Sequence, residues 1–258
     1  MNIPRKILKQ VLTVLSRWAI AKHDMELIVV TGFYGTEIVR EGIYELLSET
    51  YTVRRNTTQI VWDMSIPLAV LGYPDKKRNL FQWIGLIIRA TAYLAIGGKN
   101  PHKLILNANC TFEETAHFWA AFLRPDYLIV LNYDKDSKIV DALVGRLKPE
   151  KSILIYDKDN VDFEKLNKAK YKDTFVYGKN KVALVYNVQL REITYKEEVL
   201  KIPDAVPKVT IPHIAAIFAV VIKQGIQFSE AGFGALKFDM GALLVKRIKA
   251  NFEKAGTN

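Results

Sequence analysis

The chain has 258 residues, half of them hydrophobic, so it can bury a substantial core and does not have the composition of a disordered chain. Its single cysteine excludes an internal disulfide framework and a cysteine-rich zinc site. The net charge of +10 and the isoelectric point near 9.4 favour an anionic partner, a class that includes lipid headgroups, nucleic acid and acidic proteins.

The first predicted element is a basic amphipathic helix over residues 3–20, which we assign to an N-terminal helical segment, 1–22. Its apolar residues recur at helical spacing, and its basic residues lie largely on the remaining surface. The segment lacks a small-residue cleavage site after a clean apolar stretch, so no secretory signal is evident. We therefore expect a cytoplasmic protein whose first helix packs on the domain, with attachment to the inner membrane surface as the alternative.

A strand, a tight glycine turn and a helix follow in "LIVVTGFYGTEIVREGIYELL", residues 27–47. We expect a strand over 27–31, a turn between Gly32 and Gly35, and a helix over 36–49. In nucleotide-binding proteins, the glycines of such a turn let backbone N–H groups face a phosphate at the helix N-terminus. The pattern therefore predicts the architecture of a phosphate loop.

The residues after the second glycine do not have the chemistry of a phosphate loop. A lysine there would bridge the outer phosphates and a hydroxyl would hold Mg²⁺, but this chain has Thr36 and Glu37. A carboxylate at Glu37 would repel a poorly screened triphosphate by several kcal/mol, on the order of a close charge pair. The nearest cation, Arg40, lies about one turn further along the helix. A structural turn, with Glu37 favouring the positive end of the helix, explains the pattern at least as well.

Residues 80–96, "LFQWIGLIIRATAYLAI", form an almost continuously apolar segment that contains Gln82 and Arg89. The segment is shorter than the roughly 20 residues that a helix needs to cross a bilayer. We therefore expect a helix packed on the domain, with membrane-surface attachment as the alternative.

The rest of the chain alternates strand-like and helix-like segments, which predicts an α/β fold with a mostly parallel sheet flanked by helices. The predicted strands lie at 27–31, 103–107, 127–132, 152–156 and 174–177. The predicted helices lie at 36–49, 80–96, 112–123, 138–147 and 161–169. Alternating apolar and polar residues over 181–202 predict antiparallel strands at one edge of the sheet. After the proline-bearing link "PDAVPKVTIP" and the apolar stretch "HIAAIFAVVIKQGI", we expect a last basic helix over 239–254, in a basic C-terminal segment 241–258.

Four segments follow one another along the chain: "VVTGFYGTEIVREGIYELL", "VRRNTTQIVWDMSIPLAVLG", "LILNANCTFEETAHFWAAFLRPDYLIVLN" and "IAAIFAVVIKQGI". In order and spacing, they resemble the central ATP-binding domain of the Mur ligases, most closely the branch that adds D-alanyl-D-alanine to the muramyl peptide. The resemblance covers roughly residues 10–240 and implies a P-loop NTPase-like domain over 23–240. From the resemblance, we expect neither the family's N-terminal UDP-sugar domain nor its C-terminal ligase domain.

The resemblance implies a reaction whose site residues can be compared one by one. Such ligases use ATP to convert a carboxylate into an acyl phosphate, which an amine then attacks, so they need cations around the phosphoryl group. The family's GxxGKT or GxxGKS turn has Thr36 here in place of the lysine and Glu37 in place of the hydroxyl. Ungapped counts from the "RPD" motif place Asn107 at the family's magnesium-binding glutamate and Ser137 at its metal-serving histidine. An amide oxygen is a poorer Mg²⁺ ligand than a carboxylate.

The family's contacts to the base and ribose are expected in "ILIYDKDN". Asp157 or Asp159 could retain the aspartate, whereas Ile155 or Tyr156 replaces the asparagine. The family's carbamylated lysine has no counterpart that we can identify.

For the other candidate residues, the sequence favours structural roles. The histidines show no metal-ligand spacing, so we expect core or surface roles for His23, His102, His117 and His213. We do not transfer the family's histidine to His213, because counting back from Gly225 places it nearer Val209. Cys110 is expected to be a small buried thiol rather than a nucleophile. Glu113–Glu114 are expected to point to different faces of a helix and to favour its N-terminus, rather than to form an acid/base pair.

These comparisons predict a catalytically degenerate, Mur-ligase-like pseudoenzyme that acts as a binding, scaffolding or regulatory component linked to cell-wall peptide synthesis. We expect no cofactor and a protein partner, for which an intact Mur-ligase paralogue is one candidate. An anionic membrane surface is a further candidate, while no signature of a nucleic-acid-binding module emerges. The alternative is an ATP- and Mg-dependent carboxylate–amine ligase with an atypical phosphate loop, or one completed by another subunit.

Overall fold

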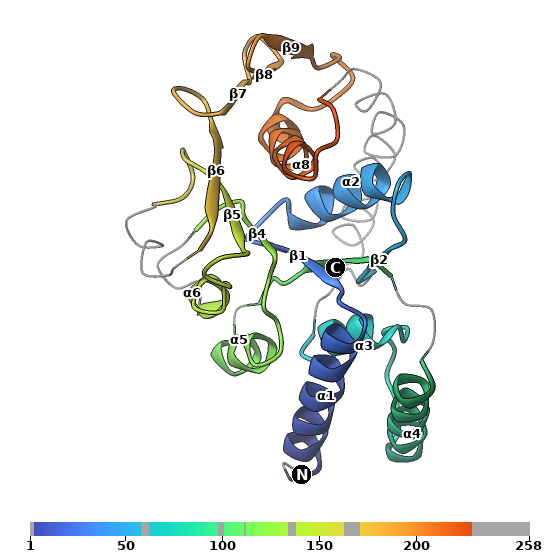
Figure 1. Cartoon of the computed structure of the whole chain (residues 1–258). Coiled ribbons are helices and arrows are strands. Elements are labelled where there is room, and N and C mark those ends of the chain that lie inside the picture. Colours follow the sequence, from blue (N-terminus) through green and yellow to red (C-terminus); the bar gives the residue numbers. More distant parts are fainter. Residues whose placement is uncertain are drawn as a thin grey trace, which may run out of the picture.

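The computed structural model describes residues 3–57, 62–97, 101–110, 112–133, 138–162 and 171–228. Within them, a single twisted sheet lies between two layers of helices (Figure 1). One layer consists of α2 (Thr36–Ser48) and α8 (Ile211–Lys223), and the short 3₁₀ helix η1 (Lys208–Thr210) leads into α8. The other layer contains α1 (Ile3–Lys22), α3 (Ser65–Leu71), α4 (Leu80–Ile96), α5 (Glu113–Ala120) and α6 (Lys138–Val144).

Within the described residues, the sheet has nine strands in the order β2-β3-β1-β4-β5-β6-β7-β8-β9. The strands are β1 (Glu26–Thr31), β2 (Val53–Arg55), β3 (Lys103–Asn107), β4 (Tyr127–Val130), β5 (Ile153–Asp157), β6 (Asp173–Gly178), β7 (Leu184–Asn187), β8 (Glu192–Tyr195) and β9 (Glu198–Lys201). All pairs from β2 to β7 are parallel, and only β7–β8 and β8–β9 are antiparallel. The mostly parallel α/β sheet with an antiparallel edge is therefore confirmed.

Two elements differ from the prediction. The edge strand β2 was not predicted, because its three residues include two arginines and carry no strand pattern. Helix α3 was not predicted either, because it has only seven residues and contains a proline near its start. The predicted helix over 161–169 lies outside the described residues except for its first two positions. The predicted helix over 239–254 and the segment 241–258 lie wholly outside them.

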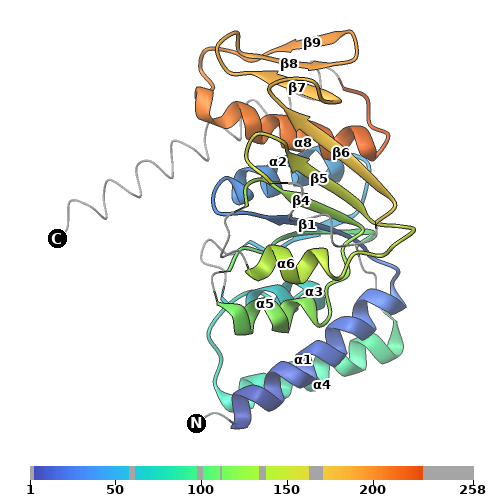
Figure 2. The same cartoon turned by 90° about the vertical axis from the view of Figure 1, so that its left-hand side faces the viewer.

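The central strands are apolar because helices cover both of their faces. The residues from Leu27 to Thr31 are all buried, which is typical of a parallel strand between two helical layers. Helix α8 is buried along almost its whole length, between α2 and the strands β5 to β8 (Figure 2). Each of its buried Ile, Val and Phe side chains contributes about 1.5–3 kcal/mol to folding.

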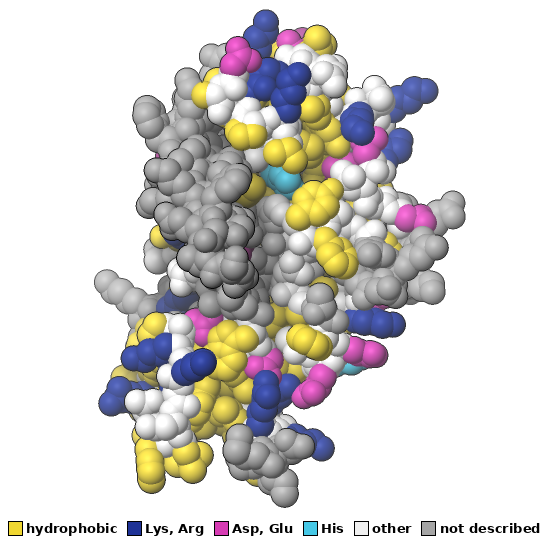
Figure 3. Space-filling view, turned by 180° about the vertical axis from the view of Figure 1, so that it is seen from behind, with side chains coloured by type: hydrophobic (Ala, Val, Ile, Leu, Met, Phe, Trp, Pro, Cys, Tyr) yellow, Lys and Arg dark blue, Asp and Glu magenta, His cyan; other side chains and the backbone are white. Residues whose placement is uncertain are grey.

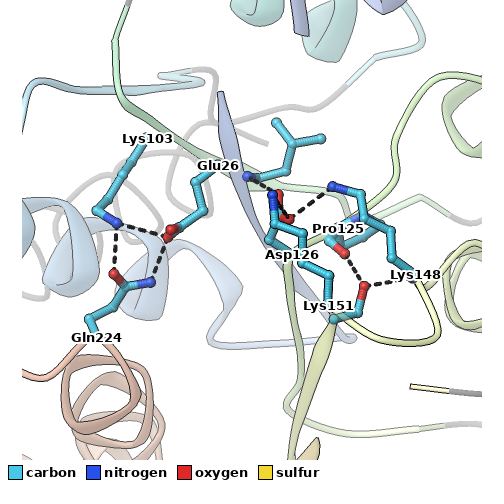
Figure 4. A network of polar contacts seen from close by, with 9 residues as sticks. Glu26, Lys103, Pro125, Asp126, Lys148, Lys151 and Gln224 are labelled. Atoms are coloured by element: carbon cyan, nitrogen blue, oxygen red, sulfur yellow. Dashed lines mark hydrogen bonds and ion pairs between the residues drawn. The ribbon is translucent and has the colours of Figure 1, made fainter. Parts of the chain in front are cut away.

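Two clusters of polar contacts, which we call clamps, hold together the amino-terminal ends of the central strands (Figure 4). The buried Asp126, from the "RPD" motif, accepts a hydrogen bond from the Leu27 N–H at 2.9 Å and pairs with Lys148 at 2.8 Å and Lys151 at 3.2 Å. Beside it, the Ser152 hydroxyl donates to the Pro125 carbonyl at 2.5 Å. These contacts join β1 to β4 and β5, so the motif that carried part of the family resemblance has a structural role in this chain.

A second clamp ties the end of α8 to the sheet. Lys103 is buried and pairs with Glu26 at 2.9 Å, while its ammonium also donates to the Gln224 side chain at 2.7 Å. The Gln224 amide in turn donates to Glu26 at 2.6 Å (Figure 4). The two clamps lie at the opposite end of the strands from the glycine turn.

The predicted N-terminal helix is confirmed as α1. It buries Leu12, Leu15 and Ala19 against the domain, and Arg5 and Lys9 both pair with the buried Asp63. Among the described helices, none has both the length and the apolar character needed to cross a membrane.

Candidate functional site

The glycine turn lies at the carboxyl end of β1, where ligands bind in open parallel sheets. Gly32 has a φ of 143° and Gly35 a φ of 78°, and both values favour glycine. Helix α2 begins directly after Gly35, without a side-chain hydrogen bond to its first turn. The predicted strand, turn and helix are therefore confirmed as local architecture.

Side chains from neighbouring strand ends hold the backbone of this turn. The Asn132 side chain, just after β4, accepts a hydrogen bond from the Phe33 N–H through Oδ1. Its amide group donates to the Tyr34 carbonyl at 3.4 Å, and the Asn109 amide donates to the Phe33 carbonyl at the same distance. One of the N–H groups that a phosphate loop would turn toward its anion is thus engaged by an amide oxygen.

His213, near the start of α8, lies directly against Gly35. A Cβ atom placed on Gly35 would be 1.9 Å from the His213 Nε2, so the imidazole occupies the space that any side chain at this position would need. The Tyr34 ring meets the imidazole edge to face at a centroid distance of 5.9 Å. His213 is buried, as expected for a core histidine, but its contact with the turn was not predicted from spacing along the chain.

We expect His213 to make the stability of the fold depend on pH. Burial lowers the pKa of His213 from its ordinary value of 6.5, so the folded state binds this proton less well than the unfolded state. Stability should therefore be retained above about pH 6.5 and should decrease as the pH falls below it. We expect His213→Gln to lose less stability than the unmodified chain between pH 7.5 and 5.5, measured by urea unfolding. Equal losses in the two proteins would contradict this prediction.

Arg40 and Glu41 of α2 form an ion-pair cluster with Arg55 of β2. Arg40 is buried and contacts Glu41 Oε1 through Nε at 2.8 Å and Nη2 at 2.7 Å. Arg55, at the end of β2, pairs with Glu41 Oε2 at 2.8 Å and lies over the Tyr44 ring, 3.5 Å from its centroid. Glu41, which the sequence did not single out, thus binds both nearby cations. Thr36 at the first position of α2 is also buried.

Of the two residues that the resemblance aligns with the family's metal ligands, the structure describes one, Asn107. Asn107 is buried at the end of β3, where its backbone N–H and carbonyl are paired with the Asn56 side chain at 2.8 and 3.1 Å. Its side-chain Oδ1 has no hydrogen-bond partner among the described residues. Ser137 lies outside the described residues. In the part of the chain that the structure describes, no three His, Cys, Asp or Glu side chains gather into a metal-binding group.

The predicted nucleotide contacts lie at the end of β5 and in the turn after it. The buried Asp157 accepts hydrogen bonds from the Asp159 N–H at 2.9 Å, the Asn160 amide at 2.7 Å and the Tyr186 hydroxyl at 3.1 Å. Burial raises the pKa of Asp157, and these hydrogen bonds oppose that shift. Asp159 is exposed and accepts a hydrogen bond from the Lys179 N–H at 2.6 Å. Two of these bonds order the turn after β5, and the third joins its start to Tyr186 of β7.

The remaining candidate residues do not combine into a second site. Burial raises the pKa of the Cys110 thiol to about 12, so it stays protonated at neutral pH. Glu113 lies 3.4 Å from His117 on α5, whereas Glu114 pairs with Lys9 of α1 at 2.6 Å. The two glutamates thus have different partners, in agreement with the prediction that they point to different faces.

No family model matches the sequence, and no curated protein matches it either. Solved structures match the fold. MurF ligase from Thermotoga maritima in complex with ADP has a TM-score of 0.66 and 16% identity, over 87% of this chain and 51% of that one. MurF from Acinetobacter baumannii also has a TM-score of 0.66, with 11% identity, over 89% of this chain and 49% of that one.

FolC from E. coli in complex with ADP is a more distant match, with a TM-score of 0.54 and 14% identity over 89% of this chain and 61% of that one. The chain spans about half the length of the MurF structures that it matches. The element order, the mostly parallel sheet and these matches together show that the chain has the Mur ligase fold.

Proposed function

We propose that the chain is a catalytically degenerate, Mur-ligase-like domain that acts as a binding or scaffolding component instead of an ATP-dependent ligase. The observation that carries this proposal is the charge at the start of α2. Thr36 and Glu37 stand where the phosphate-binding lysine and the metal-binding hydroxyl would be, and the neighbouring Arg40 and Arg55 are both bound to Glu41.

The charges of the described residues near the turn support a site that does not use Mg-ATP. Transfer of a phosphoryl group requires positive charge on its oxygens and on those of the leaving group. At this turn, Glu37 adds a carboxylate, and Glu41 offsets one of the two arginine charges. Asn107 presents an amide to the position where a carboxylate would hold the metal. The loss of one such electrostatic contact typically costs about 2.7–4 kcal/mol of transition-state stabilisation, so several losses together leave little activity.

The fold supports a relation to the enzymes of cell-wall peptide synthesis. The matched structures include a UDP-N-acetylmuramoylalanyl-D-glutamyl-2,6-diaminopimelate--D-alanyl-D-alanyl ligase from Acinetobacter baumannii. On this basis we propose a protein partner, and an intact Mur-ligase paralogue is the first candidate. A tagged copy purified from the native cell should retain such a ligase, and its absence from the purified material would remove this candidate.

Nucleotide binding tests the proposal. In a calorimetric titration, we expect the unmodified chain to show no binding of Mg-ATP in the micromolar range. Thr36→Lys combined with Glu37→Thr restores the phosphate-loop residues and should strengthen binding by about tenfold or more, the effect of gaining one charged contact. Glu37→Gln alone, which only removes the carboxylate, should have a smaller effect. Circular dichroism would verify that each variant is folded.

The alternative function predicts the opposite result. An ATP-dependent carboxylate–amine ligase would bind Mg-ATP with micromolar affinity in the unmodified chain and would release phosphate when a muramyl peptide is added. Both observations together would overturn the proposal of a degenerate site.

A further inference from the structure

Helix α4 exposes its apolar side. It packs on the domain through a narrow stripe, Leu86, Ala90 and Leu94, which are all buried at i, i+4 and i+8. On the opposite side of the helix, Phe81 is 82% exposed and Ile88 is 63% exposed. A surface helix normally turns polar residues toward water, so this arrangement leaves an apolar face that no described segment covers.

Helix α1 lies beside α4 and extends this face. The two helices are in contact, and the Lys22 ammonium at the end of α1 donates to the carbonyls of Leu94 and Ala95 at the end of α4. Figures 1 and 2 show both helices in the outermost layer, farthest from α2 and α8. Helix α1 adds two exposed apolar side chains, Ile7 and Val14, and the partly exposed Trp18.

Helices α1 and α4 themselves carry only positive charges. Residues 3–22 and 76–96 contain no Asp or Glu, and their cations are Arg5, Lys6, Lys9, Arg17, Lys22, Lys76, Lys77, Arg78 and Arg89. Arg5 and Lys9 share the carboxylate of Asp63, and Lys9 also pairs with Glu114 of α5. Lys6, Lys76, Lys77 and Arg89 are exposed. Figure 3 shows hydrophobic side chains gathered at the α4 end of the molecule with Lys and Arg side chains close to them.

We propose that the exposed face of α1 and α4 binds the surface of an anionic lipid membrane, with both helices lying in the plane of the interface. Helix α4 has 17 residues and is about 25 Å long, which is less than the roughly 30 Å of a hydrocarbon core, so it suits an in-plane position. An apolar face with basic flanks inserts at the boundary between headgroups and acyl chains. Phe81, Ile84 and Ile88 occupy that boundary, and the surrounding lysines and arginines meet lipid phosphates.

The charge distribution favours a membrane over a protein partner of mixed charge. Every ionised side chain on the two helices is a cation, which matches a surface of uniform negative charge. Trp18 and Trp83 belong to the same layer, and tryptophan is enriched at the level of the headgroups. This inference does not depend on whether the glycine turn binds a nucleotide.

Vesicle flotation tests the proposal with the full chain. We expect the protein to float with vesicles of 70% phosphatidylcholine and 30% phosphatidylglycerol and to bind at least about tenfold more weakly to pure phosphatidylcholine. Phe81→Ser combined with Ile88→Ser should weaken binding to the anionic vesicles by at least about tenfold, because two exposed apolar anchors are removed. Lys76→Glu combined with Lys77→Glu should weaken the same binding.

A matched control uses an apolar side chain elsewhere on the surface. Leu190 lies between β7 and β8 and is 65% exposed, so Leu190→Ser should leave vesicle binding unchanged. Equal binding by the Phe81/Ile88 double variant and the unmodified chain would overturn the proposal, as would equal binding to both vesicle types. A dimer in light scattering that this double variant converts to a monomer, without vesicle binding, would assign the face to a second copy and would also overturn it.

Discussion

Gly35→Ala is expected to destabilise the fold by about 2–4 kcal/mol, the sum of a strained backbone and an overpacked contact. The alanine Cβ would lie 1.9 Å from the His213 Nε2, a distance that requires the imidazole or the turn to move. The φ of 78° at this position adds a penalty for any residue with a Cβ. Because α8 is buried on all sides, His213 has little room to withdraw.

Urea unfolding measures this effect, and the chain contains its own control. A Cβ on Gly85, in the middle of α4, meets no atom within 4 Å, so Gly85→Ala should stabilise the fold by about 0.5–1 kcal/mol through helix propensity. Combining Gly35→Ala with His213→Ala removes the clash but keeps the backbone strain, and it tests their separate contributions. If the two single glycine variants had the same stability, the close contact between Gly35 and His213 would be wrong.

Asp126→Ala is expected to destabilise the fold by about 3 kcal/mol or more, because it removes a buried carboxylate that three donors share. The Leu27 N–H would lose its acceptor inside the sheet, and the ammonium groups of Lys148 and Lys151 would lose their anion. Asp126→Asn keeps an oxygen for the N–H group and removes the charge, so its effect should be smaller.

The control for Asp126 is a solvent-exposed ion pair of the same protein. Asp204 pairs with Arg191 at 3.2 Å, but its side chain is fully exposed, so Asp204→Ala should have almost no effect. Thermal and urea unfolding of the three variants give the comparison. Similar losses of stability for Asp126→Ala and Asp204→Ala would show that the contacts of Asp126 do not stabilise the fold.

The sequence predicted most of the sheet for a simple reason. Strands buried on both faces, such as β1, β3 and β4, are short continuous apolar runs, and the helices between them have their own period. The edge strand β2 has no such run, because its three residues "VRR" are only partly buried and pair on one side with β3. Its existence depends on a neighbour that local pattern does not reveal.

For the candidate site as well, the sequence predicted the local features and missed the contacts between distant segments. The glycine turn between Gly32 and Gly35 was predicted, since glycines between a strand and a helix are a local signal. The contacts of Asn132 and His213 with the turn were not predicted, nor was the pairing of Glu41 with Arg40 in the helix that follows it. Two of these three come from segments far along the chain, so the contact exists only after the sheet has brought the strand ends together.

By itself, the sequence determined the alternation of strands and helices and the glycine turn, because each is a property of neighbouring residues. It also determined that Thr36 stands where a phosphate loop has its lysine. Only the tertiary structure decided that Arg40 and Arg55 share one carboxylate and that α4 buries just one narrow stripe of its apolar surface. The physical reason is that periodicity shows how apolar each face of a helix is, whereas the packing of distant segments determines which faces are covered.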